Sequence, residues 1–214
     1  MLGVIKKPEH CIKNCKYHEI GRGFCPDFIG KTPKVAFLLE APGPDEIVAR
    51  EPLIGRSGKF WLKALVNPLG YTREDCIISN VLRCFPENME YPSFPYRQPA
   101  EKACRYYDDK HGVNGKLFPG GIKDFNPNIF LLTYHPAAIL RTKAYLKIVR
   151  SDVKKAFNFY EEGWRPCLLM GAKAGALFLP FIEGNGGLDN WHSHIWEGEF
   201  KGKTTTLTLH KRLI

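Results

Sequence analysis

The sequence predicts an α/β fold, a three-layer sandwich around a central, mainly parallel sheet of four strands. Four short apolar runs, at 34–39, 76–79, 128–133 and 167–170, alternate with segments of helical periodicity. Strands that alternate with helices are typical of a parallel sheet covered by helices. Runs that are apolar at nearly every position are expected of strands buried on both faces. We expect the 214 residues to form a single domain, 1–214.

The elements follow from local signals along the chain. The first apolar run, KVAFLL, ends at the Pro- and Gly-rich loop 40–44. Ser57 is expected to cap the helix GKFWLKALVNPLG, which Gly70 ends. Later elements are expected to be helices at about 137–144 and 151–161 (the second capped by Ser151), a helix opening at 171–174, and a late edge strand at 204–209.

The charge balance points to a polyanionic partner. The chain has 31 Lys and Arg against 22 Asp and Glu, a formal net charge of +9, and such an excess is common in nucleic-acid-binding proteins. No apolar run is long enough to cross a membrane, and the N-terminus lacks the apolar core of a signal peptide. We therefore expect a monomer without a membrane partner, located in the cytoplasm (nucleoid-associated, or in the host cytoplasm if the chain is viral).

Polar residues follow three of the predicted strands. Glu40, Ala41, Pro42 and Gly43 come after the first strand, Asn80 after the second and His135 after the third. Ligands of parallel α/β folds bind beyond the carboxyl ends of the strands, so these side chains are expected to converge on one edge of the sheet. A carboxylate, an amide and an imidazole in one cleft suggest chemistry on a base or a sugar.

Several segments together resemble a known family. They are VAFLLEAPGPDEIVAREPLIGRSGKFW at 35–61, CIISNVLRC at 76–84, RQP at 97–99, EKAC at 101–104, and YHPA at 134–137 with the Leu140-Arg141 pair. This combination resembles the iron–sulfur family 4 uracil-DNA glycosylases and their family 5 relatives, within the uracil-DNA glycosylase superfamily. The resemblance covers most of residues 11–155 and implies a uracil-DNA glycosylase-like fold.

The resemblance implies a role for each residue at the strand ends. Glu40 would position or activate the attacking water, Asn80 would read the Watson–Crick edge of an extruded pyrimidine, and His135 would hydrogen-bond the base carbonyl. Breaking a base–sugar bond leaves negative charge on the base, so a donor at that carbonyl is what the reaction requires. The remaining site residues are the substrate contacts Ala41, Pro42, Gly43 and Leu53 and the DNA contacts Arg56, Ser57, Lys59, Arg141 and Lys143.

The cysteines fit the same family. The resemblance implies a structural four-iron four-sulfur cluster, whose ligands are Cys11, Cys15, Cys84 and Cys104 in loops at about 11–25 and 84–104. Four thiolates are the usual ligand set of such a cluster. The first pair here is spaced Cys-x-x-x-Cys instead of Cys-x-x-Cys, which leaves Cys25 as an alternative to Cys15. A zinc site of Cys11, Cys15, Cys25 and His18 is the alternative metal centre.

Three features depart from the family pattern. Leu39 stands where the family has a Gly before the motif Glu, which adds bulk beside the catalytic loop. Leu53 stands where the family has a Phe that stacks on the flipped uracil. The segment CLLMGAKA at 167–174 follows the His-Pro strand, whereas the family has its counterpart before that strand. Either these two strands have exchanged order in the chain, or His210 near the C-terminus is the counterpart of the family's His and His135 is not.

These observations together predict an enzyme, a DNA glycosylase that flips a uracil or modified pyrimidine out of single- or double-stranded DNA and hydrolyses its N-glycosidic bond. A transferase-type enzyme that modifies a flipped pyrimidine on the same fold is one alternative, and a non-catalytic DNA-binding module is another. The presence of Glu40, Asn80 and His135 argues against the last. The identity of the base, the strand preference, and a role in repair or in DNA modification stay open.

Overall fold

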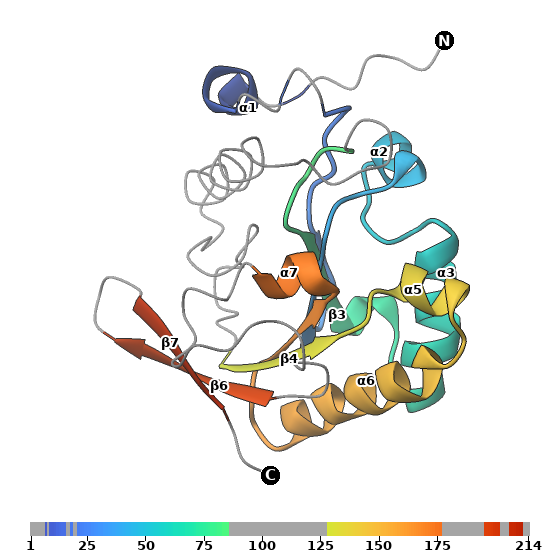
Figure 1. Ribbon diagram of the computed structural model, residues 1–214, viewed down its shortest axis with the longest axis vertical. Helices are drawn as coiled ribbons and strands as arrows, with labels where there is room; N and C mark the ends of the chain where they lie inside the picture. Colours follow the sequence, from blue (N-terminus) through green and yellow to red (C-terminus); the bar gives the residue numbers. More distant parts are fainter. Residues whose placement is uncertain are drawn as a thin grey trace.

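The centre of the protein is a parallel sheet of four strands, as the sequence predicts (Figure 1). The computed structural model describes residues 7, 9–15, 18, 21–85, 128–176, 195–201 and 206–211. The parallel strands, in spatial order, are β3 (Cys76–Asn80), β2 (Val35–Leu39), β5 (Pro166–Met170) and β4 (Ile129–Thr133). Every residue of these strands is buried, because helices cover both faces of the sheet. The α/β fold class is thereby confirmed.

Antiparallel strands extend both edges, so the sheet has seven described strands and is mixed. The two-residue strand β1 (Phe28–Ile29) pairs with β3, and the hairpin of β6 (Ile195–Lys201) and β7 (Thr206–Lys211) continues the sheet from β4. The predicted late edge strand is β7, displaced by two residues. Periodicity alone did not indicate β1 and β6, since one is very short and the other, IWEGEFK, contains a central glycine.

Helices lie on both sides of the sheet. On one side are α3 (Arg56–Trp61), α5 (Pro136–Arg141) and α6 (Tyr145–Glu161), and on the other is α7 (Ala172–Ala176) (Figure 1). The first layer packs its aromatic side chains on the sheet: the Phe37 ring lies 4.9 Å from Trp61, edge to face, and 6.5 Å from Phe157. No helix in the described part of the chain is long and apolar enough to span a membrane.

Two predicted helix starts are wrong. Gly55 caps α3, so Ser57 lies inside the first turn; the segment then continues as a π-helical turn (Leu62–Val66) and a 3-10 turn (Asn67–Leu69) up to Gly70. The helix α6 begins at Tyr145 and Ser151 is exposed in its middle. Packing decides this second boundary, because Tyr145 stacks at 3.9 Å on Tyr134 and holds the first turn against the preceding loop.

The order of strands in the chain differs from their order in space. The strand β5 follows β4 in the sequence, yet it pairs with β2 on one side and with β4 on the other. The segment after β5 therefore returns to the same sheet edge as the ends of β2 and β4. Gly171 begins this segment, and its N–H donates to the carbonyl oxygen of Thr133 at 2.8 Å.

Candidate active site

A cavity of about 620 Å³ opens at the carboxyl ends of β2, β3 and β4. Parallel α/β folds commonly bind their ligands at this edge. Its lining brings together most of the residues that the sequence singled out, namely Glu40, Ala41, Pro42, Gly43, Leu53, Arg56, Ser57, Asn80, His135 and Arg141. The predicted DNA contacts Lys59 and Lys143 do not line the cavity. Both side chains are exposed, and both residues lie close in sequence to the lining residues Ser57 and Arg141.

The sheet register places Glu40 and Asn80 next to each other. Leu39 pairs with Asn80 across β2 and β3, so Glu40 leaves the sheet beside the end of β3. The chains stay paired beyond the strands, since the N–H of Val81 donates to the Leu39 carbonyl at 2.9 Å and that of Leu82 to the Glu40 carbonyl at 3.1 Å. Asn80 is 4% exposed. A fixed amide and a carboxylate therefore share one wall of the cavity.

The imidazole of His135 is held as a neutral hydrogen-bond donor. His135 caps α5, and its Nδ1 accepts the Ala137 N–H at 3.1 Å. A backbone N–H can only donate, so Nδ1 carries no proton and the ring proton resides on Nε2. Burial, and to a smaller extent the charge of Arg141, lower the pKa of His135 to about 4. At neutral pH the ring thus offers one N–H donor and no charge.

Gly171 lies against the Cβ of His135, a contact that the sequence did not reveal. The φ angle of Gly171 is 95°, a left-handed conformation that favours glycine. A Cβ at this position would lie 3.3 Å from the His135 Cβ. The segment that follows β5 lies against His135 because β5 is inserted between β2 and β4 in the sheet. The order of the strands in the sequence did not predict this insertion.

The loop carrying Leu53 is fixed in a strained conformation. Leu53 has a φ of 56°, which costs a non-glycine residue on the order of 1–2 kcal/mol. Arg73 holds this loop by donating to the carbonyl oxygens of Pro52 and of Leu53, the latter at 3.2 Å. A Cβ on Gly58 would lie 1.8 Å from the Leu53 carbonyl oxygen, so only glycine permits the close approach of α3. Leu53 is 6% exposed and provides an apolar wall.

A second carboxylate in the cavity, that of Glu46, joins two of its walls. Glu46 is 9% exposed in α2 (Pro44–Ala49), and its Oε1 accepts the Gly55 N–H at 3.0 Å. Its Oε2 lies 2.5 Å from where a Cβ on Gly43 would be. Glu46 therefore ties the loop after β2 to the Gly55 turn. In sequence it looks like an ordinary acidic residue in the first turn of a helix, so no sequence signal identified it.

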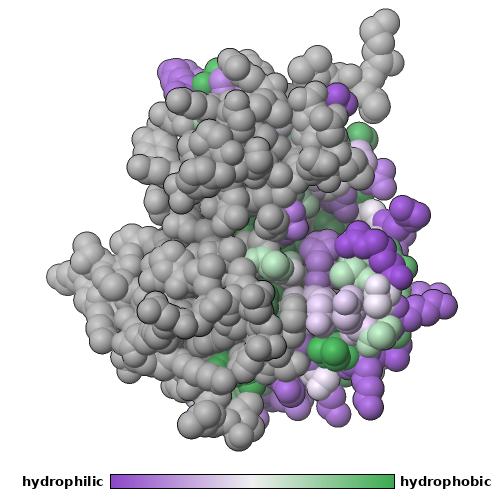
Figure 2. Space-filling view, in the orientation of Figure 1, coloured by the Kyte–Doolittle hydropathy of each residue, from purple (hydrophilic) through white to green (hydrophobic). Residues whose placement is uncertain are grey.

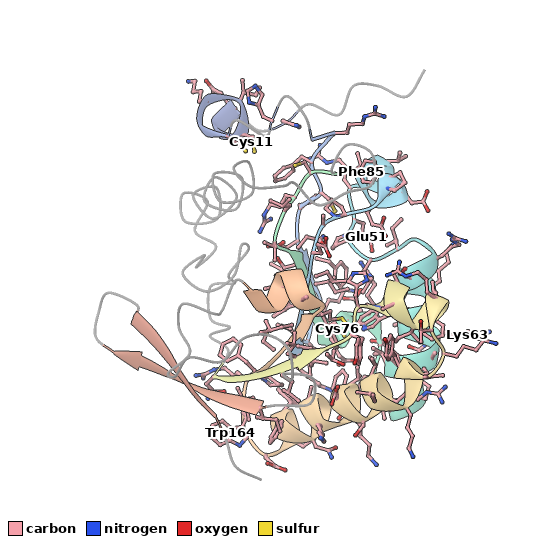
Figure 3. All side chains as sticks on the ribbon, viewed as in Figure 1. Cys11, Glu51, Lys63, Cys76, Phe85 and Trp164 are labelled. Carbon is pink, nitrogen blue, oxygen red and sulfur yellow. The ribbon has the colours of Figure 1, made fainter. Side chains whose placement is uncertain are left out.

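Phe85 is a lining residue that sequence reasoning missed. It lies five residues beyond Asn80, in the segment that follows β3, and is labelled in Figure 3. Two reciprocal backbone hydrogen bonds, of 2.8 and 2.9 Å, pair Phe85 with Arg22. Only its position directly after Cys84 and near Asn80 could have marked it in the sequence.

Three of the four predicted cluster cysteines lie in one region. Cys11 and Cys15 are buried at α1 (Glu9–Asn14), and the Cys11 side chain lies on the inner side of this helix (Figure 3). The pKa of Cys84 rises to about 12 mainly through burial, and also because Cys15 and Cys11 lie near; the ammonium of Lys7 opposes this rise. Cys104 lies outside the described residues.

Cys25 is buried, and its N–H donates to the carbonyl oxygen of Arg83, the residue before Cys84, at 2.7 Å. Burial raises the pKa of Cys25 to about 12, and the charged groups that act on it are Glu46, Asp27, Arg83 and Arg73. Among the described residues, no three Cys, His, Asp or Glu side chains form a group that could hold a metal ion. This holds alike for the three described cluster thiols and for the alternative zinc set of Cys11, Cys15, Cys25 and His18.

Two arginines line the cavity, and two further basic side chains lie close to them in the sequence. Arg56 and Lys59 are exposed on α3, Arg141 is exposed at the end of α5, and Lys143 is exposed just beyond it. These two helices contact each other. Figure 2 shows hydrophilic side chains along this side of the molecule. Lys and Arg clustered at one face form the surface expected to bind a phosphate backbone.

Comparisons with known proteins agree with this geometry. The model of the uracil DNA glycosylase superfamily matches residues 26–107, which include β2, β3, Glu40 and Asn80. Over this segment the chain is similar to the uracil-DNA glycosylase superfamily. It resembles the type-4 uracil-DNA glycosylase of Saccharolobus solfataricus, with 26% identity over 171 residues, which are 67% of this chain and 79% of that protein.

Two other similar proteins carry the same name. The type-4 uracil-DNA glycosylase of Pyrobaculum aerophilum is 27% identical over 188 residues, 72% of this chain and 93% of that protein. That of Archaeoglobus fulgidus is 33% identical over 90 residues, 42% of this chain and 44% of that protein. Identities of this size are consistent with a divergent family 4 member.

Proposed function

We propose that the protein is a DNA glycosylase that extrudes a uracil or a related modified pyrimidine from DNA and hydrolyses its N-glycosidic bond. The observation that carries the proposal is that Glu40, Asn80 and His135, from three different strand ends, line one cavity. The relatives named type-4 uracil-DNA glycosylase support glycosylase chemistry in general. The identity of the base is the finer part of the proposal, because Leu53 replaces the aromatic residue of the family.

The neutral imidazole of His135 suits the departing base. As the bond between base and sugar breaks, its electron pair moves onto the base and negative charge develops on the pyrimidine carbonyl. An Nε2–H donor beside that oxygen stabilises the charge as it forms. Because Ala137 holds Nδ1, the donor is oriented before the substrate arrives and needs no reorganisation during the reaction.

Glu40 and Asn80 divide the remaining work. The sugar becomes cationic as the base leaves, and a carboxylate at Glu40 stabilises that charge and orients the water that attacks the sugar carbon. As the water oxygen bonds to the sugar carbon, its proton passes to the Glu40 carboxylate, and the bonding electron pair of the broken bond stays on the departing base. The buried amide of Asn80 presents both a donor and an acceptor, which matches the alternating groups along the edge of a pyrimidine.

The basic rim supplies the DNA contacts. Arg56 and Arg141 line the cavity, and two exposed lysines, Lys59 on α3 and Lys143 two residues beyond α5, add positive charge. Phosphate contacts fix the position of the DNA without reading its sequence. They also offset the cost of extruding a nucleotide, which is about a few kcal/mol.

The thiols of Cys11, Cys15 and Cys84, with Cys104 as the fourth, are proposed to hold a four-iron four-sulfur cluster. The mutual influence of the three described thiols supports a common site. Such a cluster would be structural, joining α1 to the segment after β3.

The function is tested by incubating the protein with single- and double-stranded oligonucleotides that contain one uracil, followed by alkali, which breaks the strand wherever a base is missing. The wild-type chain should produce breaks at the uracil. Glu40→Gln and His135→Gln should each reduce the rate about 100- to 1,000-fold, the usual cost of losing one preorganised electrostatic group.

Matched controls separate chemistry from folding. Asp45→Asn removes another carboxylate of the same cavity, and His210→Gln removes a histidine of the edge strand β7; both variants should keep most of the activity. If the wild type releases neither uracil nor any modified pyrimidine from DNA, the proposed glycosylase function is wrong. If His210→Gln abolishes release and His135→Gln does not, the assigned histidine is wrong.

A further inference from the structure

The described lining of the cavity contains one side chain with a phenyl ring, that of Phe85. The two lining leucines, Leu39 and Leu53, are aliphatic, and the remaining apolar lining residues are alanines, prolines and glycines. An extruded base leaves a stack in which both of its faces were covered, so a pocket that holds the base gains from a flat aromatic surface. Leu53 stands at the position where the family has its stacking residue, and it has no such surface.

The loop that carries Leu53 is held in one conformation. Its backbone is clamped between Arg73, which donates to the Leu53 carbonyl at 3.2 Å, and Gly58, whose missing Cβ would lie 1.8 Å from the same oxygen. A left-handed leucine persists only where its surroundings over-determine it. Leu53 therefore contributes a fixed aliphatic wall.

The backbone of Phe85 is fixed as firmly. The pair of hydrogen bonds to Arg22 engages both its N–H and its carbonyl oxygen, and two residues earlier the Arg83 carbonyl accepts the Cys25 N–H at 2.7 Å. The Arg83 guanidinium and the Asp27 carboxylate form a buried ion pair of 2.8 Å that joins the same two segments. A ring carried by such a doubly anchored segment is preorganised, so it loses little freedom when a base stacks on it.

We propose that Phe85 is the aromatic contact on which the extruded pyrimidine stacks, taking over the role that Leu53 cannot fill, and that Phe85 thereby determines base affinity. The inference rests on the proposed function in one respect only, that the cavity receives a base from DNA. A ring in the segment after β3, on the same segment as Asn80, would let one stretch of chain both stack on the base and read its edge.

The inference is tested by binding, without turnover. One oligonucleotide carries 2′-fluoro-2′-deoxyuridine, whose fluorine disfavours the cationic sugar and so prevents cleavage; a second carries a tetrahydrofuran abasic analogue at the same position. The ratio of the two affinities measures the contribution of the base. Phe85→Leu should lower this ratio about 10- to 100-fold, the size of one base–aromatic stack, whereas Phe85→Tyr should keep it.

Control variants locate the effect at the ring. Phe24→Leu changes a buried phenylalanine of the neighbouring segment that does not line the cavity, and it should leave the ratio unchanged. Leu53→Phe, added to Phe85→Leu, should restore part of the ratio. Should Phe85→Leu fail to fold, Phe85→Trp provides the measurement: its fluorescence, compared with wild type, should be quenched by the uracil analogue and not by the abasic one.

The outcomes separate the inference from the function. An unchanged ratio in Phe85→Leu, or equal loss of affinity for both oligonucleotides, overturns the stacking role, and so does Phe85→Trp fluorescence that responds to both alike. A chain that releases no base yet loses base-dependent affinity in Phe85→Leu would retain the inference and refute the glycosylase activity. Active wild-type enzyme with an unaffected Phe85→Leu would do the reverse.

Discussion

Lowering the pH should destabilise the protein through His135 in a range where most carboxylates have not yet titrated. The folded chain holds the pKa of His135 at about 4, below its ordinary value of 6.5, mainly by burial. In the unfolded chain the ring titrates near 6.5. Below that pH the ring is protonated in the unfolded chain but not yet in the folded chain, so the equilibrium moves toward unfolding.

The size of the effect follows from the two pKa values. The contribution of the neutral ring to the free energy of unfolding is fully present above pH 6.5, declines as the pH falls, and is almost gone at about pH 4. The difference between the two pKa values corresponds to a total loss of about 3 kcal/mol. That is a large part of the 5–15 kcal/mol typical of a folded domain. The tautomer predicts a second observation: the catalytic rate should show no titration near pH 6.5, because the Nε2–H donor is neutral on both sides of it.

Urea unfolding measured at several pH values between 7.5 and 4.5 tests this reasoning against His135→Asn. Asparagine is a favourable helix cap whose side-chain oxygen can accept the Ala137 N–H, so the variant keeps the cap and loses only the titrating ring. The difference between the two chains cancels carboxylate titration and any loss of a cluster. His210→Asn should behave like the wild type. If wild type and His135→Asn lose stability in parallel, the ring is not held neutral and the proposed donor role fails.

Two further predictions concern DNA and iron. Replacing both Arg56 and Arg141 by alanine should weaken binding to duplex DNA. The slope of log affinity against log salt concentration should become less steep by about 0.9 for each phosphate that the variant no longer neutralises. An unchanged slope in a salt titration would show that these side chains do not contact phosphate. Cys84→Ser should lose the iron and the visible colour of the purified protein. Cys25→Ser, the same substitution at a buried cysteine outside the proposed ligand set, should keep both. Equal iron content by elemental analysis in both variants would disprove the assignment of Cys84.

The sequence predicted the fold well where local pattern and burial agree. Runs such as VAFLL are apolar at every position because both faces of β2 are covered, and that burial is written directly into the residues. The residues at the ends of such strands were predictable for the same reason, since parallel strands present their carboxyl ends at one edge. Glu40, Asn80 and His135 could thus be expected in one cavity from the sequence alone.

The tertiary structure decided what depends on contacts between distant segments. The sequence cannot show that β5 inserts between β2 and β4, and so it could not reveal that Gly171 packs on His135. Glu46 and Phe85 reach the cavity only because the Gly55 turn and the Arg22 segment fold against them. Local pattern records whether a residue is buried; which partner it meets depends on the path of the whole chain, and that partner determines the chemistry of the site.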